Sequence, residues 1–183
     1  MVALSTPKVE KGWKARDFKL HAVDGKFYSL DDVKGDKGLV VAFICNHCPY
    51  VQSIAKKIVR DADELKELGV GFIAINSNDT TIVPDDSFDA MKLFAKRYKF
   101  NFPYVIDDSQ EVAKEYDAVC TPDFFGFNAH LELQYRGRLD SAKTDMIPDA
   151  KRELFIAMSE VAQTGEFLGQ QMPSIGCSIK WSK

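Results

Sequence analysis

The residues around one pair of cysteines strongly constrain how this chain can fold. An apolar run rich in β-branched residues, from Gly38 to Ile44, leads directly into a Cys-Asn-His-Cys motif at residues 45–48. Pro49 follows, and apolar residues then recur at helical spacing until Gly69. Such a run is typical of a strand buried on both faces, and proline is tolerated in the first turn of a helix. The sequence therefore predicts a buried strand that delivers two cysteines to the start of a helix.

Two cysteines at a helix N-terminus suit thiol-disulfide exchange. The attacking sulfur must be a thiolate, and the unpaired N–H groups and positive dipole end of a helix stabilise that anion. With two residues between them, a mixed disulfide at Cys45 can be resolved by Cys48. Four cysteines in 183 residues are too few for a disulfide scaffold, and a Cys-x-x-Cys motif in such a chain is typical of redox chemistry. We therefore expect this pair to form the working site.

Length and charge narrow the organisation of the chain and its classes of partner. A chain of 183 residues is most simply one domain, residues 1–183, in which we expect residues 165–183 to be an irregular C-terminal tail. Its 27 acidic and 24 basic residues leave no basic surplus for nucleic-acid or anionic-membrane binding. The N-terminus has no apolar region of signal-peptide length, and no segment approaches the roughly 18 consecutive apolar residues of a membrane span. We expect a cytoplasmic protein without nucleic acid or membrane as a partner.

The patterns along the rest of the chain predict an α/β fold with a mixed central sheet and helices on both faces. Val70 to Ile75 completes a strand-helix-strand unit, whose crossover makes its two strands parallel. An N-terminal β-hairpin is expected around Asp24-Gly25, and a second hairpin near residue 130. We expect further strands at 18–20, 27–30, 104–106, 123–128 and 132–136, and further helices at 87–99, at 109–116 with Ser109 as N-cap, and from Pro148 onward.

A polar loop at residues 76–86 follows the strand that ends at Ile75. Because α/β proteins often place ligand contacts at the carboxyl ends of strands, we expect this loop to border the site. We interpret Asp85-Asp86 within it as a solvated loop and helix cap rather than as a metal site, since no third carboxylate follows at ligand spacing. The aromatic residues Phe124, Phe125 and Phe127 are expected in the core, because hairpin strands bury alternate residues.

Several motifs together resemble a known family. They are Gly12, Asp17-Phe18-x-Leu20, Asp24-Gly25-Lys26, the strand leading into Cys45-Asn46-His47-Cys48-Pro49, Cys120-Thr121-Pro122-Asp123-Phe124-Phe125 and Tyr135-Arg136-Gly137-Arg138-Leu139-Asp140. With these motifs the chain resembles the thioredoxin-like superfamily, and more closely its redoxin branch of alkyl hydroperoxide reductases and thiol-specific antioxidants. The resemblance implies a thioredoxin-like fold and a redox-active dithiol.

The resemblance also implies roles for individual residues. Cys45 would be the exposed nucleophile and Cys48 the more buried resolving thiol. Thr121 and Pro122 match the place where thioredoxin-like proteins hold a cis proline against the active-site disulfide. That position leaves the backbone before the proline free to pair with an extended substrate. A cis X-Pro bond costs only about 0.5 to 1 kcal/mol over trans, so a fold can hold it readily.

The two residues between the cysteines differ from those of thioredoxin, where Gly-Pro stands in place of Asn46-His47. Strongly oxidising members of the superfamily also have a histidine at the position of His47. A charged imidazole there would favour the Cys45 thiolate, which stabilises the reduced form and makes the disulfide more oxidising. The favoured partner and the redox poise should therefore differ from those of thioredoxin.

The chain departs from the peroxiredoxin pattern Pro-x-x-x-Thr-x-x-Cys. Aligning that cysteine on Cys48 puts Cys45 where the threonine belongs and Val41 where the proline belongs. Peroxiredoxins also place an arginine near the peroxidatic sulfur. The corresponding stretch here is Cys120-Thr121-Pro122, which has no arginine, and Arg136 and Arg138 come later in the chain. These departures count against fast peroxide reduction.

Two further cysteines have open roles. Cys120 lies two residues before the proline and could exchange with the dithiol, but a small buried residue is the favoured interpretation. Cys177 lies in the expected tail, close to Trp181. It fits a second resolving thiol, as some relatives use a C-terminal cysteine, and it fits an idle tail residue equally well.

We expect a thiol-disulfide oxidoreductase that uses the Cys45/Cys48 dithiol and needs no cofactor, because the dithiol itself carries the two electrons. Its partners would be protein or small-molecule thiols and disulfides, with an external reductant such as a thioredoxin system or glutathione. One alternative is an atypical thiol peroxidase that reduces hydroperoxides through a sulfenic acid.

A second alternative is a non-enzymatic module that binds a metal or senses redox state. Structural zinc needs four ligands, usually in two closely spaced pairs. Cys120 and Cys177 are isolated, and we expect His21 and His130 on loops, with His130 facing water in a turn. No metal is therefore expected.

Overall fold

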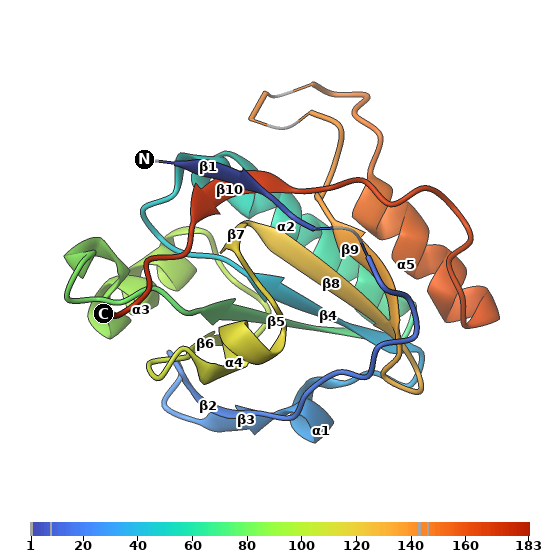
Figure 1. The fold of residues 1–183 in the computed structure, drawn as a ribbon. Helices are drawn as coiled ribbons and strands as arrows, with labels where there is room; N and C mark the ends of the chain where they lie inside the picture. Colours follow the sequence, from blue (N-terminus) through green and yellow to red (C-terminus); the bar gives the residue numbers. More distant parts are fainter. Residues whose placement is uncertain (1, 8, 143, 146) are drawn as a thin grey trace.

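The computed structural model describes residues 2–7, 9–142, 144–145 and 147–183. Its main feature is a seven-stranded mixed sheet of order β3-β2-β6-β5-β4-β8-β9 (Figure 1). These strands are β2 (Lys19–Ala22), β3 (Phe27–Ser29), β4 (Gly38–Phe43), β5 (Val70–Asn76), β6 (Tyr104–Ile106), β8 (Asp123–Asn128) and β9 (Leu133–Gly137). The predicted mixed sheet and both predicted hairpins are confirmed.

Strand β4 lies inside the sheet, as its sequence predicts. It pairs in parallel with β5 and antiparallel with β8, and all six of its residues are buried. Successive side chains of β4 point to opposite faces of the sheet. Val40 and Ala42 pack into one apolar cluster, and Leu39 and Val41 pack into the other. A strand with both edges paired and both faces covered is apolar throughout, which explains the continuous apolar run from Gly38 to Ile44.

Helices cover both faces of the sheet (Figure 1). The helices are α1 (Leu30–Val33), α2 (Pro49–Glu67), α3 (Phe88–Arg97), α4 (Glu111–Glu115) and α5 (Glu153–Thr164), with a 3₁₀ turn, η1 (Pro84–Asp86). Residues of α2, α3 and α5 pack into one cluster, and residues of α1 and α4 into the other. Among the described residues, none of these helices combines the length and apolar character needed to cross a bilayer.

Two helix starts differ from the prediction. Helix α4 has Gln110 at its N-cap, in the left-handed region, so the expectation of Ser109 at that position is wrong. Helix α5 begins at Glu153 rather than at Pro148. Its first turn is anchored by tertiary contacts, because the Arg138 guanidinium donates to the Glu153 carboxylate at 2.7 Å and Leu139 accepts a backbone bond from Leu154. Local helix signals do not report such contacts.

Two histidine expectations have different outcomes. His21 lies in β2 rather than on a loop, and its ring stacks against the rings of Phe27 and Phe88 with 4.7 Å between centroids in each case. Aromatic stacking therefore explains this residue without a metal. His130 is exposed in the turn between β8 and β9, as expected. The three phenylalanines of β8 are buried, which confirms their place in the core.

The expected irregular tail contains a strand, β10 (Ile175–Ser178). It lies between β1 (Ala3–Ser5) and β7 (Cys120–Thr121) in a second, antiparallel sheet of order β1-β10-β7. In Figure 1, β1 and β10 run side by side above the large sheet. Gly176 permits the close approach, since a Cβ there would lie 1.8 Å from the Thr121 carbonyl oxygen. The expectation of an irregular tail is therefore wrong for these residues.

Candidate active site

The Cys-x-x-Cys motif joins the end of β4 to the start of α2. Cys48 is the N-cap of α2 and Pro49 is its first residue, as the sequence predicts. Both cysteines of the motif are thiols, and both are 0% exposed. Cys45 Sγ lies 3.3 Å from Thr121 Oγ1 and 3.5 Å from His47 Nδ1, and these two side chains help to cover it. The expectation of an exposed Cys45 is therefore wrong, whereas that of a buried Cys48 is confirmed.

The other side of the dithiol is closed by the tail strand β10. Cys48 Sγ lies 2.8 Å from Cys177 Sγ and 3.3 Å from the Thr121 carbonyl oxygen. Cys177 is 1% exposed. The structure therefore brings three sulfur atoms, those of Cys45, Cys48 and Cys177, into one buried cluster. Sequence reasoning assigned a definite role only to Cys45 and Cys48.

The contacts within this cluster separate the acidities of the two motif thiols. The hydrogen bond from the Cys45 thiol lowers the pKa of Cys48 to about 5, despite burial, and contacts with Cys177 and the Val51 backbone add to this effect. Burial first, then the contact with Cys48 and the negative charge of Asp86, raise the pKa of Cys45 well above its usual value. These contacts make Cys48 the more acidic thiol of the pair, whereas the sequence favoured Cys45.

Asp86 organises the loop between the two cysteines. Its carboxylate accepts hydrogen bonds from the backbone N–H groups of Asn46 (2.7 Å) and His47 (3.2 Å) and from the Asn78 side-chain amide (2.8 Å). It also lies 2.5 Å from His47 Nδ1. Asp86 is 0% exposed, so its interpretation as a solvated residue is wrong, although Asp85 is exposed. The expectation that the loop at 76–86 borders the site is confirmed.

Asn46 ties the motif to the neighbouring strand. Its side-chain oxygen accepts a hydrogen bond from the Tyr104 hydroxyl at 2.8 Å, and its amide donates to the Asp85 carbonyl at 3.1 Å. Tyr104 is 0% exposed, so this bond satisfies a buried hydroxyl. Asn46 therefore holds the loop in position.

One group of side chains at the site has metal-ligand chemistry. The sulfur of Cys45, a ring nitrogen of His47 and a carboxylate oxygen of Asp86 lie within 4.8 Å of one another. These are donor types that Zn²⁺ accepts, but a structural zinc site uses four. The Asp86 carboxylate also already accepts the bonds that shape the loop. Metal binding would therefore require rearrangement of this network.

The peptide bond between Thr121 and Pro122 is cis, which confirms the expectation from the resemblance. The backbone before this proline is not free, however. In the register of β7 with β10, Thr121 lies opposite Cys177 and Cys120 lies opposite Ser178. The tail strand thus occupies the edge that was expected to receive an extended substrate.

The contacts of Cys120 and Arg136 are those of structural residues rather than of catalytic ones. The Cys120 sulfur lies 3.9 Å from the Pro122 carbonyl oxygen, and burial raises the pKa of its thiol. Arg136 pairs with Asp123 at 2.9 Å and lies over the Phe125 ring, in the apolar cluster on the sheet face opposite the dithiol cluster. Arg136 is therefore not an arginine beside the reactive sulfur.

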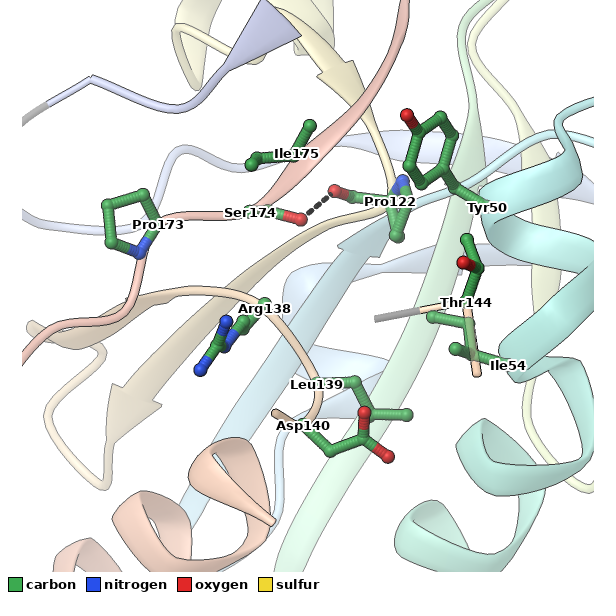
Figure 2. A pocket seen from close by; sticks show the side chains of 10 residues that line it. All are labelled: Tyr50, Ile54, Pro122, Arg138, Leu139, Asp140, Thr144, Pro173, Ser174 and Ile175. Atoms are coloured by element: carbon green, nitrogen blue, oxygen red, sulfur yellow. Dashed lines mark hydrogen bonds between the residues drawn. The ribbon is translucent and has the colours of Figure 1, made fainter. Parts of the chain in front are cut away.

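A cavity of about 290 Å³ lies beside Pro122, between the first turns of α2 and the tail (Figure 2). It is lined by Tyr50, Ile54, Pro122, Arg138, Leu139, Asp140, Thr144, Pro173, Ser174 and Ile175. The Ser174 hydroxyl donates to the Pro122 carbonyl oxygen, which fixes one wall. Tyr50 and Ile175 are each two residues from a clustered cysteine in the sequence, but none of the described cysteines lines this cavity.

A Cys45→Ala variant should show a higher Cys48 pKa. A hydrogen bond to a charged group contributes about 1.5–3 kcal/mol, which corresponds to roughly 1 to 2 pKa units. We expect a titration of thiolate absorbance to move from about 5 upward by that amount. Cys120→Ala is the matched control and should leave the low value in place. An unchanged titration in Cys45→Ala would show that the Cys45 thiol does not stabilise the Cys48 thiolate.

Comparison with protein families matches residues 12–141 to the AhpC/TSA family. Among curated proteins, the chain is 29% identical over 122 residues to the thiol-disulfide oxidoreductase ResA of Halalkalibacterium halodurans, covering 67% of this chain and 65% of that protein. It is 27% identical over 119 residues to a chloroplastic peroxiredoxin Q of Populus jackii, covering 65% of this chain and 51% of that protein. The chain thus spans between half and two thirds of these relatives.

Solved structures show the same architecture. An uncharacterized conserved protein from Geobacillus kaustophilus is 43% identical, with a TM-score of 0.93, covering 100% of this chain and 97% of that one. The peroxidoxin BcpB of Mycobacterium tuberculosis is 15% identical, with a TM-score of 0.62, covering 85% of this chain and 97% of that one. At that identity the likeness shows the fold alone, and it confirms the predicted thioredoxin-like architecture.

Proposed function

The chain belongs to the AhpC/TSA family, and on that premise we propose that it is a thiol-disulfide oxidoreductase whose reactive pair is Cys45 and Cys48. The observation that carries the proposal is the placement of the two thiols at the start of α2, against the cis Thr121–Pro122 peptide bond, and the lowered pKa of Cys48, about 5, supports it. A thiol beside a thiolate in a Cys-x-x-Cys motif is a reduced dithiol able to deliver two electrons to a disulfide. No bound cofactor takes part in this exchange.

The proposed reaction starts from the proton shared by the two sulfurs. When that proton moves to Cys48, Cys45 becomes the thiolate, beside the partly exposed ring of His47. Cys45 then attacks a substrate disulfide, and one substrate thiol leaves. Cys48 gives up its proton and attacks the Cys45 sulfur of the mixed disulfide, which releases the second substrate thiol and closes the Cys45–Cys48 disulfide. An external reductant, such as a thioredoxin system or glutathione, then reduces the Cys45–Cys48 disulfide back to the dithiol.

The reduction potential of the pair tests this function. A stabilised thiolate favours the reduced form, so we expect a potential above thioredoxin's value of about −270 mV. Equilibration in glutathione buffers, followed by alkylation of the remaining thiols, measures it. A value at or below that of thioredoxin would contradict the role of the Cys48 thiolate. Absence of a Cys45–Cys48 disulfide in every buffer would contradict the function itself.

A peroxidase is the second candidate, because Cys48 has the acidity of a peroxide-reactive thiol and because one curated relative is named a peroxiredoxin. The pairing of Arg136 on the opposite sheet face counts against it. Stopped-flow peroxide consumption separates the two functions. Rapid consumption that survives Cys45→Ser but not Cys48→Ser would favour the peroxidase.

A metal-binding module is the third candidate, and the side chains of Cys45, His47 and Asp86 favour it. Zinc content after purification under reducing conditions tests it. Stoichiometric zinc that is lost in His47→Ala would assign this group as a metal site and would count against thiol catalysis.

A further inference from the structure

We propose that Cys177 is a third redox-active thiol, which exchanges with the Cys45–Cys48 disulfide to form a second disulfide between Cys48 and Cys177. The proposal deepens the proposed function and rests on it, because the first disulfide must form before the exchange. The observation that carries it is the contact of 2.8 Å between Cys48 Sγ and Cys177 Sγ.

The backbone holds Cys177 at this position from both sides. In β10, Cys177 lies opposite Ala3 of β1 and opposite Thr121 of β7. The hydrogen bond from the Ile179 N–H to the Val119 carbonyl, at 3.1 Å, continues the pairing beyond the strand. Cys177 is therefore a residue of a paired strand and is not an idle side chain on a loose tail.

The distance between the sulfurs favours bond formation. A disulfide has an S–S length of about 2.05 Å, so the two sulfurs need to approach by only about 0.8 Å. Both cysteines are at most 1% exposed, which excludes competing solution thiols from this contact. Cys48 also contacts Cys45, so it is the common neighbour of two possible partners.

The exchange balances without any added oxidant. The Cys177 thiolate attacks the Cys48 sulfur, the Cys48–Cys177 bond forms, and the Cys45–Cys48 bond breaks. Cys45 leaves as a thiolate and takes up the proton that Cys177 gave up. One disulfide and one thiol are present before and after the step, so no electrons are gained or lost.

The charges around Cys177 change in the direction that this step needs. In the reduced protein, burial first and then the contact with Cys48 raise the pKa of Cys177 to about 12. When Cys48 is oxidised to a disulfide it has no negative charge, so it no longer raises the pKa of Cys177. The positive charge of Lys180 acts in the opposite direction and favours the Cys177 thiolate. Cys177 is thus more reactive when Cys48 is oxidised, which is when the exchange takes place.

The exchange would separate two tasks within the site. After it, the disulfide lies between α2 and the tail strand, and Cys45 is again a thiol beside His47. The Cys45 thiol can then form a mixed disulfide with a further substrate, releasing one substrate thiol, while the first oxidation is stored in the Cys48–Cys177 disulfide.

Disulfide mapping tests the proposal. Reduced wild type, Cys45→Ser and Cys177→Ser are oxidised with diamide, alkylated, digested and mapped by mass spectrometry. In Cys45→Ser the first disulfide cannot form, so diamide itself must oxidise Cys48 and Cys177, and a Cys48–Cys177 peptide there shows that these two thiols can bond. In Cys177→Ser we expect only the Cys45–Cys48 peptide. Wild type should give both peptides, and this measurement needs no substitution. Cys120→Ser is the matched control and should give the same peptides as wild type.

The outcomes distinguish failure of this proposal from failure of the proposed function. If no Cys48–Cys177 peptide forms in wild type or in Cys45→Ser, while Cys177→Ser still closes Cys45–Cys48, the role of Cys177 is overturned and the oxidoreductase stands. If Cys177→Ser forms no Cys45–Cys48 disulfide either, the proposed function fails. A Cys48–Cys120 peptide in Cys45→Ser would show that the third redox-active thiol is Cys120 of β7 rather than Cys177 of β10, and it would also overturn the proposal.

Discussion

A Cys48→Ser variant is expected to reduce substrate disulfides at least about 100-fold more slowly than the wild type. Serine does not carry out thiol-disulfide exchange, and loss of a nucleophile that acts as part of a unit removes nearly the whole contribution of that unit. Cys48 is also the sulfur that contacts both other clustered cysteines. Its loss therefore removes the resolving step at Cys45 as well as the exchange with Cys177.

The rate of reduction of insulin disulfides measures this effect. Cys120→Ser is a suitable control, because it makes the same chemical change at another buried cysteine, and it should keep a rate close to that of the wild type. Circular dichroism of both variants checks that each has folded. If Cys48→Ser keeps its rate within about threefold of the control, Cys48 is not part of the reactive pair.

An Arg136→Met variant is expected to lose about 3–5 kcal/mol of unfolding free energy at neutral pH, which is the usual effect of removing one partner of a buried ion pair. Asp123 is 0% exposed and Arg136 is 5% exposed. The guanidinium binds the Asp123 carboxylate at 2.9 Å and also donates to the Asp117 carbonyl at 2.7 Å. Without Arg136, the Asp123 charge would stay buried and unpaired. Urea unfolding measures the loss.

The pH dependence of this loss has a definite sign. Burial raises the pKa of Asp123 to about 6 in the folded protein, even with Arg136 opposing the shift, against 3.8 for the unfolded group. A raised pKa contributes stability that is fully present below about pH 3.8 and is lost as pH rises through about 6. Arg136→Met removes the opposing charge and raises this pKa further, so its deficit should be larger at pH 8 than at pH 5.

The matched control for this prediction is the double variant Asp123→Asn/Arg136→Met. It has no charge left to bury, so it should recover part of the stability that the single variant loses at pH 8. An equal deficit at pH 5 and pH 8, with no recovery in the double variant, would show that the loss comes from packing of the Arg136 side chain rather than from its charge.

The parts of the fold that follow from local patterns could be predicted. The run from Gly38 to Ile44 forms a strand because it is apolar throughout, and α2 ends near Gly69 because that residue adopts a positive φ of 82°. The position of the two cysteines at the start of α2 could also be predicted, because Pro49 marks the first turn of the helix. Each of these features depends on neighbours in the sequence, which a pattern can report.

The parts that depend on distant segments could not be predicted. Thr121, from a distant strand, contacts the Cys45 sulfur, and Asp86 is buried because its loop folds back onto residues 46 and 47. Strand β10 pairs with residues near the start and the middle of the chain. Nothing in the polar tail sequence reports such pairings, although an unexplained Cys177 was a signal that the tail has a purpose.

The position of β10 has a consequence for the order of events during biosynthesis. Ribosomes deliver residues 45 and 48 well before residue 177, and β7 is also complete before β10 emerges. Until then, the dithiol of the nascent polypeptide lacks one of the walls that later shield it. A newly made molecule can therefore meet cellular oxidants and reductants with its motif uncovered, and it acquires its restricted chemistry only when translation nears completion.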